Sequence, residues 1–310
     1  MEILNFNDES QSQGSDIKLS KQQEKIVKAN IVENYKILAC AGSGKSTTLI
    51  KRIKFLIEDQ QQKPEEIIVS TFNVEAANYL KMKAKQYLSL DHSERIKIIN
   101  IDKFVFEIFE EYLSQNINSN GFKLELKEIA IKVLEFLKTE ERKLEVLGQY
   151  KYFFFDEFQD INQIQYEILM LFSKNKCKIT AIGDGDQSIY SFRQSNPKFL
   201  NEDLENDIPN IKTLNLNINY RSTSKITQFC NQVLKQIHTD EDFENFKMNS
   251  LKQAGEDKNL PVTQIFEKKD KQFEQIIKEL KKLKLNNICE WNQIAILSPQ
   301  KQNQNNFLVS

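Results

Sequence analysis

Short apolar segments alternate with helical patterns along most of this chain, and that alternation restricts the folds open to it. The predicted strands are residues 35–40 (YKILAC), 65–72 (EEIIVSTF), 95–101 (RIKIINI), 150–157 (YKYFFFDE) and 178–184 (KITAIGD). Amphipathic helical patterns separate them, for example over residues 44–59 and 162–175. Strands buried on both faces form continuous apolar runs, and parallel strands need crossover connections. The pattern therefore predicts an α/β fold with helices on both faces of a parallel sheet.

Composition indicates a folded protein without a strong overall charge. The chain has 310 residues, 40% hydrophobic and 28% charged, with a formal net charge of -1. This length is typical of about two domains. Because the net charge is close to zero, any contact with nucleic acid must depend on local groups. The four cysteines lie far apart and there are two histidines, which argues against a disulfide framework and a zinc site.

The beginning of the chain is polar. Residues 1–16 (MEILNFNDESQSQGSD) are predicted to be disordered, and they lack the basic start and apolar run of a signal peptide. No segment approaches the roughly 18 apolar residues of a membrane span. We therefore expect an intracellular protein without a membrane partner, nuclear in a eukaryote and cytoplasmic otherwise.

Residues 39–46 (ACAGSGKS) follow a predicted strand and open a predicted helix. They fit the phosphate-binding pattern G-x-x-x-x-G-K-[ST], with Ala39 in place of the first glycine. Lys45 would neutralise the outer phosphates of ATP, and the hydroxyl of Ser46 would bind Mg²⁺. The predicted nucleotide-binding residues of this loop are Ala41, Gly42, Ser43, Gly44, Lys45, Ser46 and Thr47. The alternative is a chance turn at a helix start, and the flanking strand and helix count against it.

Two carboxylates follow the aromatic strand in residues 152–160 (YFFFDEFQD). Parallel α/β sheets bind ligands at the carboxyl ends of their strands. Asp156 suits a Mg²⁺ ligand, and Glu157 suits the base that polarises an attacking water. An acidic loop without a catalytic role is the alternative.

Four segments in this order and spacing resemble the UvrD/Rep-like superfamily 1 DNA helicases: ACAGSGKST, FFFDEFQD, GDGDQSIYSFR and NYRST. The resemblance extends from about Leu19 to Leu297. It implies RecA-like domains, ATP and Mg²⁺ as cofactors, and single-stranded or partly duplex DNA as partner. It also implies ATP-driven 3′-to-5′ translocation and strand separation in DNA repair or recombination.

The resemblance assigns roles to further residues around the nucleotide. Gln23 would read the adenine edge, and Tyr220 would stack on the adenine ring. Gln187 would sense the γ-phosphate, and Arg221 would reach it from the second domain as an arginine finger. Taken without the motifs, Arg221 would be an ordinary surface ion pair and Tyr220 a core aromatic.

The resemblance also indicates a DNA contact surface. Its members are Phe72, Tyr190, Phe192 and Arg193. Aromatic side chains and a cation suit single-strand binding without sequence preference, because bases stack on rings and phosphates pair with positive charge. The alternative is that these aromatics belong to the hydrophobic core.

The same resemblance predicts the domain organisation. Residues 17–212 would form a first RecA-like domain with a small helical insertion at about 105–149, and residues 213–310 would begin a second. Within the second, we expect strands at 261–267 and 293–298 around a helix at 270–285.

The later motifs of the family, including a second arginine finger, are not found in this sequence. The chain would then be a fragment, a truncated product, or one part of a split protein that works with a separate C-terminal helicase half. The functional alternative to a helicase is a non-enzymatic regulatory module that binds ATP or single-stranded DNA.

Overall fold

The computed structural model describes residues 18–114, 124–190, 192, 194–239, 243–244, 246–252 and 261–297. Residues 18–252 belong to one compact unit, Lys18–Leu260, and residues 261–297 belong to a second. The segment 1–16 predicted to be disordered lies outside the described residues, as does Arg193.

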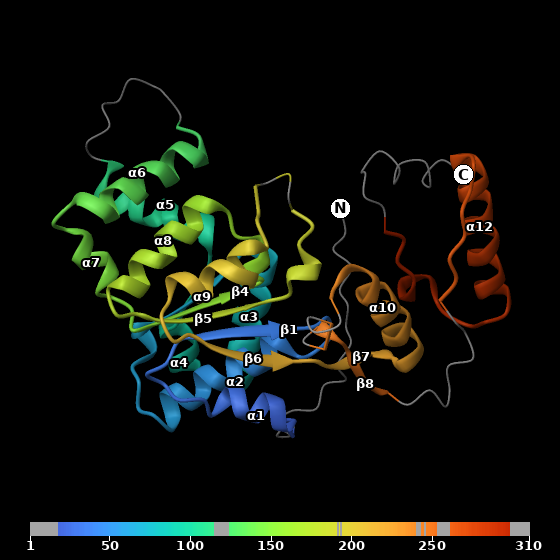
Figure 1. Cartoon of the computed structure of the whole chain (residues 1–310), viewed down its shortest axis with the longest axis horizontal. Coiled ribbons are helices and arrows are strands. Elements are labelled where there is room, and N and C mark those ends of the chain that lie inside the picture. The colour runs from blue at the N-terminus through green and yellow to red at the C-terminus, as the bar shows by residue number, and fades with distance from the viewer. Residues whose placement is uncertain are drawn as a thin grey trace. The chain divides into compact units, whose positions relative to one another are not determined.

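The Lys18–Leu260 unit is built around a six-stranded sheet (Figure 1). Its strands, in order across the sheet, are β3 (Lys97–Asn100), β2 (Ile67–Thr71), β4 (Tyr152–Asp156), β5 (Lys178–Gly183), β1 (Tyr35–Ala39) and β6 (Lys212–Leu216). Every neighbouring pair is parallel, which confirms the predicted sheet. The carboxyl ends of all these strands therefore meet at one edge.

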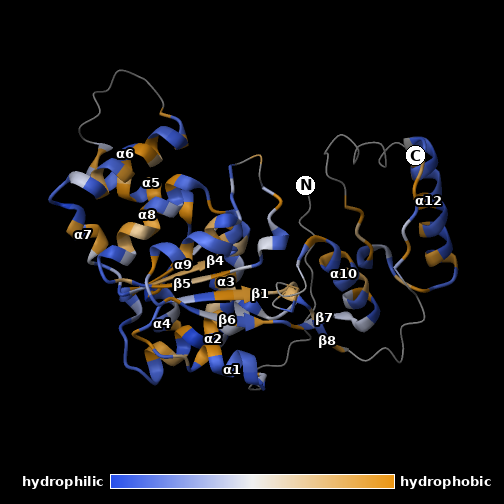
Figure 2. Cartoon of the chain, viewed as in Figure 1, coloured by the Kyte–Doolittle hydropathy of each residue, from blue (hydrophilic) through white to orange (hydrophobic). Residues whose placement is uncertain are grey.

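Helices cover both faces of the sheet, as predicted. On one face lie α1 (Lys21–Val27), α2 (Lys45–Glu58) and α3 (Val74–Tyr87), and α4 (Leu90–Arg95) connects α3 to β3. On the other lie α5 (Ile101–Tyr112), α6 (Leu126–Thr139), α7 (Lys143–Leu147), α8 (Gln163–Lys174) and α9 (Leu204–Asp207). In Figure 2 these helices carry hydrophobic and hydrophilic residues on different sides. The longer helices α2, α5, α6 and α8 thus bury one apolar stripe in the core on their side of the sheet.

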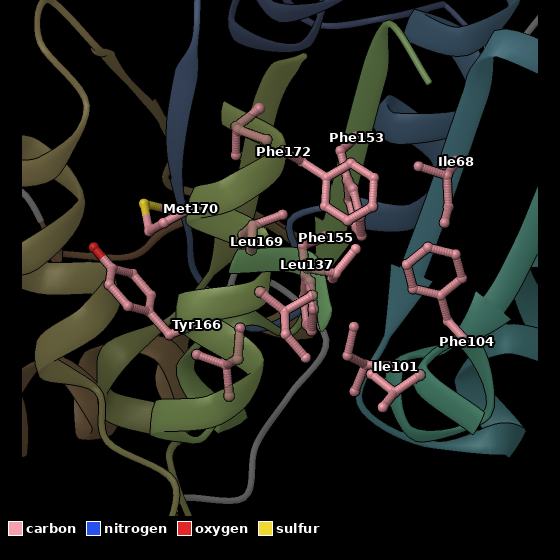
Figure 3. Close-up of a cluster of buried hydrophobic side chains, with 14 of the residues drawn as sticks. Ile68, Ile101, Phe104, Leu137, Phe153, Phe155, Tyr166, Leu169, Met170 and Phe172 are labelled. Atoms are coloured by element: carbon pink, nitrogen blue, oxygen red, sulfur yellow. The ribbon is translucent and has the colours of Figure 1, made fainter. Parts of the chain in front are cut away.

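The side chains of strand β4 are apolar on both faces of the sheet, so helices must cover both faces. Its side chains alternate, so Phe153 and Phe155 pack beneath α5, α6 and α8, whereas Tyr152 and Phe154 pack beneath α1, α2 and α3. Figure 3 shows the first cluster, in which the Phe104 ring lies 6.0 Å from that of Phe153. Burying one such ring stabilises the fold by about 1.5–3 kcal/mol.

The segment predicted as a helical insertion contains most of α5 and all of α6 and α7. Its inward residues are part of the cluster on β4, because Val133 and Leu137 are buried together with Phe153 and Phe155. The insertion therefore packs on the core of the sheet and extends it.

The chain continues from β6 into a smaller element group within the same compact unit. Strands β7 (Ile218–Thr223) and β8 (Asn249–Lys252) pair in parallel, and α10 (Ser224–Ile237) connects them. The predicted boundary at residue 213 falls inside β6, which belongs to the large sheet. The domain limits given above stay predictions.

The described residues of the second unit contain one long helix, α12 (Lys269–Leu285), at the position predicted for a helix. The prediction of strands at 261–267 and 293–298 is wrong for the residues described, since no strand occurs between 261 and 297. Ile265 and Leu297 are exposed there. An apolar run becomes a strand only when a neighbour completes its hydrogen bonds, and no strand pairs with these runs among the described residues. No described helix combines the length and apolar character that crossing a membrane requires.

Candidate nucleotide-binding site

The loop between β1 and α2 turns sharply at two glycines. Gly42 and Gly44 have φ angles of 67° and 77°, in the left-handed region that favours glycine. Gly44 is the N-cap of α2 and no side chain caps the helix there. The first N–H groups of α2 therefore remain available for an anion, and the helix dipole favours negative charge at this point.

The same glycines allow other segments to approach the loop closely. A Cβ atom on Gly42 would lie 2.8 Å from the Cβ of Arg221, and one on Gly44 would lie 2.8 Å from Nε2 of Gln23. The buried hydroxyl of Ser43 has no hydrogen-bond partner in the part of the chain that the structure describes. A cradle of free donors at a helix N-terminus fits the phosphates of ATP.

Lys45 begins α2 and points to the end of β4. Its Nζ lies 3.0 Å from Oε2 of Glu157. Glu157 has a φ of 56°, a left-handed conformation that is strained for a residue with a Cβ. The turn directs the Glu157 carboxylate toward the loop, so the structure brings together the lysine and the base that the motifs predicted.

The site concentrates acidic groups. Burial and the neighbouring Glu157 raise the pKa of Asp156 to about 7, and burial followed by Glu157 raises that of Asp160 to about 6. Burial also raises the pKa of Asp184. Burial opposes the charge on Lys45, but Glu157 and Asp156 outweigh that effect and raise the pKa of the lysine. The site therefore favours added positive charge.

The residues present fit Mg²⁺. Ser46 on the first turn of α2 and Asp156 at the end of β4 supply the hard oxygen donors that this ion prefers. No cluster of three or more His, Cys, Asp or Glu side chains that could hold a metal occurs among the described residues. Magnesium sites typically combine one or two protein ligands with substrate phosphates, and Ser46 with Asp156 match that ligand number.

Strand β7 is attached to the phosphate loop through Asn219. The buried Asn219 amide donates to the Ala41 carbonyl at 2.8 Å, and its Oδ1 accepts from the Arg221 N–H at 2.9 Å. The Tyr220 N–H donates to the Gly42 carbonyl at 2.9 Å. Tyr220 and Arg221 therefore lie beside the loop, as their predicted roles require, and the Arg221 side chain is exposed.

Gln23 approaches the loop from α1. Its Nε2 donates to the Ser43 carbonyl at 3.3 Å, and the Tyr220 hydroxyl lies 3.5 Å from its Oε1. That Oε1 also accepts from the N–H of Ser20 in the cap of α1. The structure thus joins the two residues predicted to contact adenine, with the Gln23 amide already bonded to protein groups.

Gln187 lies in a short turn, Gly185–Gln187, after β5. Its Nε2 donates to Oδ2 of Asp184 at 2.6 Å. Asp184 in turn connects to Glu157 through Gln159, which accepts from the Asp184 N–H and donates to the Glu157 carboxylate. The predicted γ-phosphate sensor and the predicted base therefore belong to one hydrogen-bonded group.

Comparison with protein families agrees with this geometry. Residues 19–122 and 98–209 match the UvrD/REP helicase N-terminal domain, and residues 214–309 match the UvrD-like helicase C-terminal domain. The chain belongs to the UvrD/Rep-like superfamily 1 helicases.

Individual relatives of this UvrD/Rep-like chain are distant. Protein R568 of Acanthamoeba polyphaga mimivirus is 31% identical over 227 residues, covering 72% of this chain and 31% of R568. The ATP-dependent DNA helicase Rep of Buchnera aphidicola (subspecies Acyrthosiphon pisum) is 26% identical over 280 residues, covering 65% of this chain and 43% of Rep. The solved Pif1 helicase of Candida albicans has a TM-score of 0.43 and 16% identity, covering 74% of this chain and 46% of Pif1. The chain thus spans less than half of each of these proteins.

The three aromatics predicted to contact DNA in this UvrD/Rep-like chain form one row. The Phe72 and Tyr190 rings lie 4.9 Å apart, and Tyr190 and Phe192 lie 5.8 Å apart. Phe72 is only 7% exposed, whereas Phe192 is 76% exposed. Phe72 therefore supports the row from the core side, and Phe192 offers the free ring face. The fourth predicted residue, Arg193, lies outside the described residues.

The sequence motifs assigned no role to two residues of this site, Asn219 and Gln159. Asn219 stands inside the quoted NYRST segment and Gln159 inside FFFDEFQD, so the motifs contained both. Their roles depend on contacts with Ala41 and Asp184, which no spacing within the chain reveals.

Proposed function

We propose that this chain binds Mg·ATP and hydrolyses it as the ATP-binding part of a UvrD/Rep-type DNA translocase or helicase. The 3.0 Å contact between Lys45 and Glu157 at the mouth of the phosphate loop is the observation that carries this proposal. It joins a phosphate-binding cation and a general base at one edge of the sheet, where nucleotide hydrolysis needs both.

Each residue of the site has a distinct task in this function. The N–H groups at the start of α2 and the Lys45 ammonium would hold the phosphates, and Ser46 and Asp156 would hold Mg²⁺. The bound Mg²⁺ would neutralise phosphate charge. Glu157 would orient the attacking water and accept its proton. Arg221 would stabilise the charge that spreads over the transferred group.

We further propose that single-stranded DNA binds along Tyr190 and Phe192. The row of rings with one exposed end supports a stacking contact. Translocation in the 3′-to-5′ direction, strand separation, and a role in repair or recombination rest on the family and are part of the same proposal. The relative from Buchnera aphidicola is named an ATP-dependent DNA helicase.

Steady-state ATP hydrolysis with and without single-stranded DNA tests this function. We expect hydrolysis that requires Mg²⁺, increases with single-stranded DNA, and disappears in Glu157→Gln. Tight binding of Mg·ATP or DNA without any hydrolysis would instead support a regulatory module that only binds them.

A further inference from the structure

Gln159 lies between the predicted base and the strand that leads to the γ-phosphate sensor. It is 2% exposed, in the short turn Phe158–Asp160 after β4. Its Nε2 donates to Oε2 of Glu157 at 2.9 Å, the same oxygen that contacts Lys45. Its Oε1 accepts from the backbone N–H of Asp184 at 3.0 Å.

The two contacts of Gln159 fix the orientation of its amide. A carboxylate can only accept hydrogen bonds when ionised, and a backbone N–H can only donate. A flipped amide would place its oxygen against Glu157 and its NH₂ group against the N–H of Asp184, so both contacts would be repulsive. Of the natural side chains, glutamine has the length and the donor and acceptor pair to satisfy both at once.

The end of β5 leaves room for the Gln159 side chain because it carries a glycine. A Cβ atom on Gly183 would lie 2.5 Å from Oε1 of Gln159, so the end of β5 must be glycine for the contact to form. The Gln159 carbonyl also accepts from the Ser188 hydroxyl at 3.3 Å. Gln159 thus contacts the turn that carries Gln187 on both sides, at Asp184 and at Ser188.

This turn continues directly into the aromatic row. Tyr190 follows Ser188 by two residues, and its ring is 5.8 Å from that of Phe192. A shift of the row on binding a DNA base would therefore reach Ser188 and Asp184 through the backbone. Because Gln159 bonds to both, such a shift would be passed to the carboxylate of Glu157.

We propose that Gln159 is a positioning residue that couples occupancy of the Tyr190–Phe192 row to the placement of the Glu157 carboxylate. This inference rests on the proposed ATP hydrolysis. When the Gln159 amide makes both of its contacts, it holds the Glu157 carboxylate toward the phosphate loop. Without the amide, Glu157 keeps its ion pair with Lys45 but loses its connection to β5.

Gln165 offers a matched control. It is a buried glutamine whose Nε2 donates to Oδ1 of Asp102 at 2.7 Å and whose Oε1 accepts from the Asn162 N–H at 3.1 Å. It therefore makes the same pair of contacts as Gln159, one carboxylate and one backbone N–H, but away from the phosphate loop. Loss of stability alone should affect Gln159→Met and Gln165→Met alike.

The experiment measures kcat and KM for ATP in the full chain, with and without oligo(dT). We expect Gln159→Met to lower the DNA-stimulated kcat by about a hundredfold, the size of effect that a small misplacement of a reacting group produces. The KM for ATP should stay close to the parent value, because Lys45 and the loop are unchanged. Gln165→Met should keep the parent kcat and the parent stimulation by DNA.

The outcomes separate this inference from the function on which it rests. A parent chain without ATP hydrolysis would overturn the proposed function itself. A parent that hydrolyses ATP, together with a folded Gln159→Met variant of equal DNA stimulation, would overturn the coupling role alone. If Gln159→Met does not fold, Gln159→Glu serves instead, since its nearly isosteric carboxylate repels Glu157 and should also abolish stimulation.

Discussion

Lys45 and Glu157 are separated by 112 residues along the chain, yet Nζ of the lysine lies 3.0 Å from Oε2 of the glutamate. The contact exists because β5 alone separates β1 from β4 in the sheet, and both residues follow the carboxyl ends of their strands. The pair is only partly exposed, so solvent screens it weakly. Phosphates entering the loop would compete with Glu157 for the lysine, which would release the carboxylate toward a water molecule.

The first prediction concerns Lys45. Replacing it with alanine should weaken Mg·ATP binding by about 1.5–3 kcal/mol, the usual contribution of a hydrogen bond to a charged group. A titration with a fluorescent ATP analogue measures the change. Lys54→Ala is the control, because Lys54 lies on the same helix and pairs with Glu58 at 3.6 Å. Equal affinities of the parent and the Lys45 variant for Mg·ATP would contradict the assignment of this loop as a phosphate-binding cradle.

The second prediction concerns Glu157. The variant Glu157→Gln keeps the shape of the side chain but removes the base, so we expect kcat to fall by roughly 10²–10⁴. Binding of Mg·ATP should persist, since the amide no longer competes as an anion for Lys45. Single-turnover hydrolysis and equilibrium binding test the two parts separately. Hydrolysis at the parent rate would exclude Glu157 as the base.

The third prediction compares two aromatics of one row. Phe192→Ala should weaken single-stranded DNA binding by about 1–3 kcal/mol without lowering the melting temperature, because the ring is exposed. Phe72→Ala should instead lower the free energy of unfolding by about 3–5 kcal/mol, because its ring is buried. Fluorescence anisotropy and thermal denaturation distinguish the two effects. Binding that is insensitive to salt would also count against a phosphate contact in this region.

The fourth prediction concerns Cys40 beside the phosphate loop. Burial, and secondarily the charge of Asp184, raises the pKa of its thiol to about 12. The reactive thiolate is therefore scarce at pH 8, and iodoacetamide should label Cys40 slowly in the folded chain. Cys230 is more accessible and should react faster. Mass spectrometry after timed labelling measures both, and rapid labelling of Cys40 in the folded protein would disprove the prediction.

The fifth prediction concerns ATP hydrolysis and DNA unwinding by the 310-residue chain alone. It should bind Mg·ATP, hydrolyse it slowly and fail to unwind duplex DNA, because we expect no second arginine finger within these 310 residues. Loss of one finger slows phosphoryl transfer by roughly 10³ or more. A strand-displacement assay tests unwinding, and restored activity after adding a separate C-terminal helicase half would support a split protein. Robust unwinding by this chain alone would refute the prediction.

Local patterns determined much of this protein. The apolar run and glycines of residues 35–46 specified a strand, a tight turn and a helix start, because backbone conformation depends mainly on nearby residues. The four aromatics of β4 specified a strand buried on both faces. The expected strands near residues 265 and 295 did not form among the described residues, because a ladder needs a partner that no local pattern supplies.

Tertiary structure alone decided which of these segments meet. The strand order β3-β2-β4-β5-β1-β6 places Glu157 beside Lys45, although β2 and β3 lie between them in the sequence. It also gives Gln159 its contact with Asp184 and Asn219 its contact with Ala41. These are pairings between distant parts of the chain, and their energies come from burial and hydrogen bonds formed only when the sheet closes. The motifs therefore named the chemical groups of the site, and the packing of the sheet determined which of those groups touch.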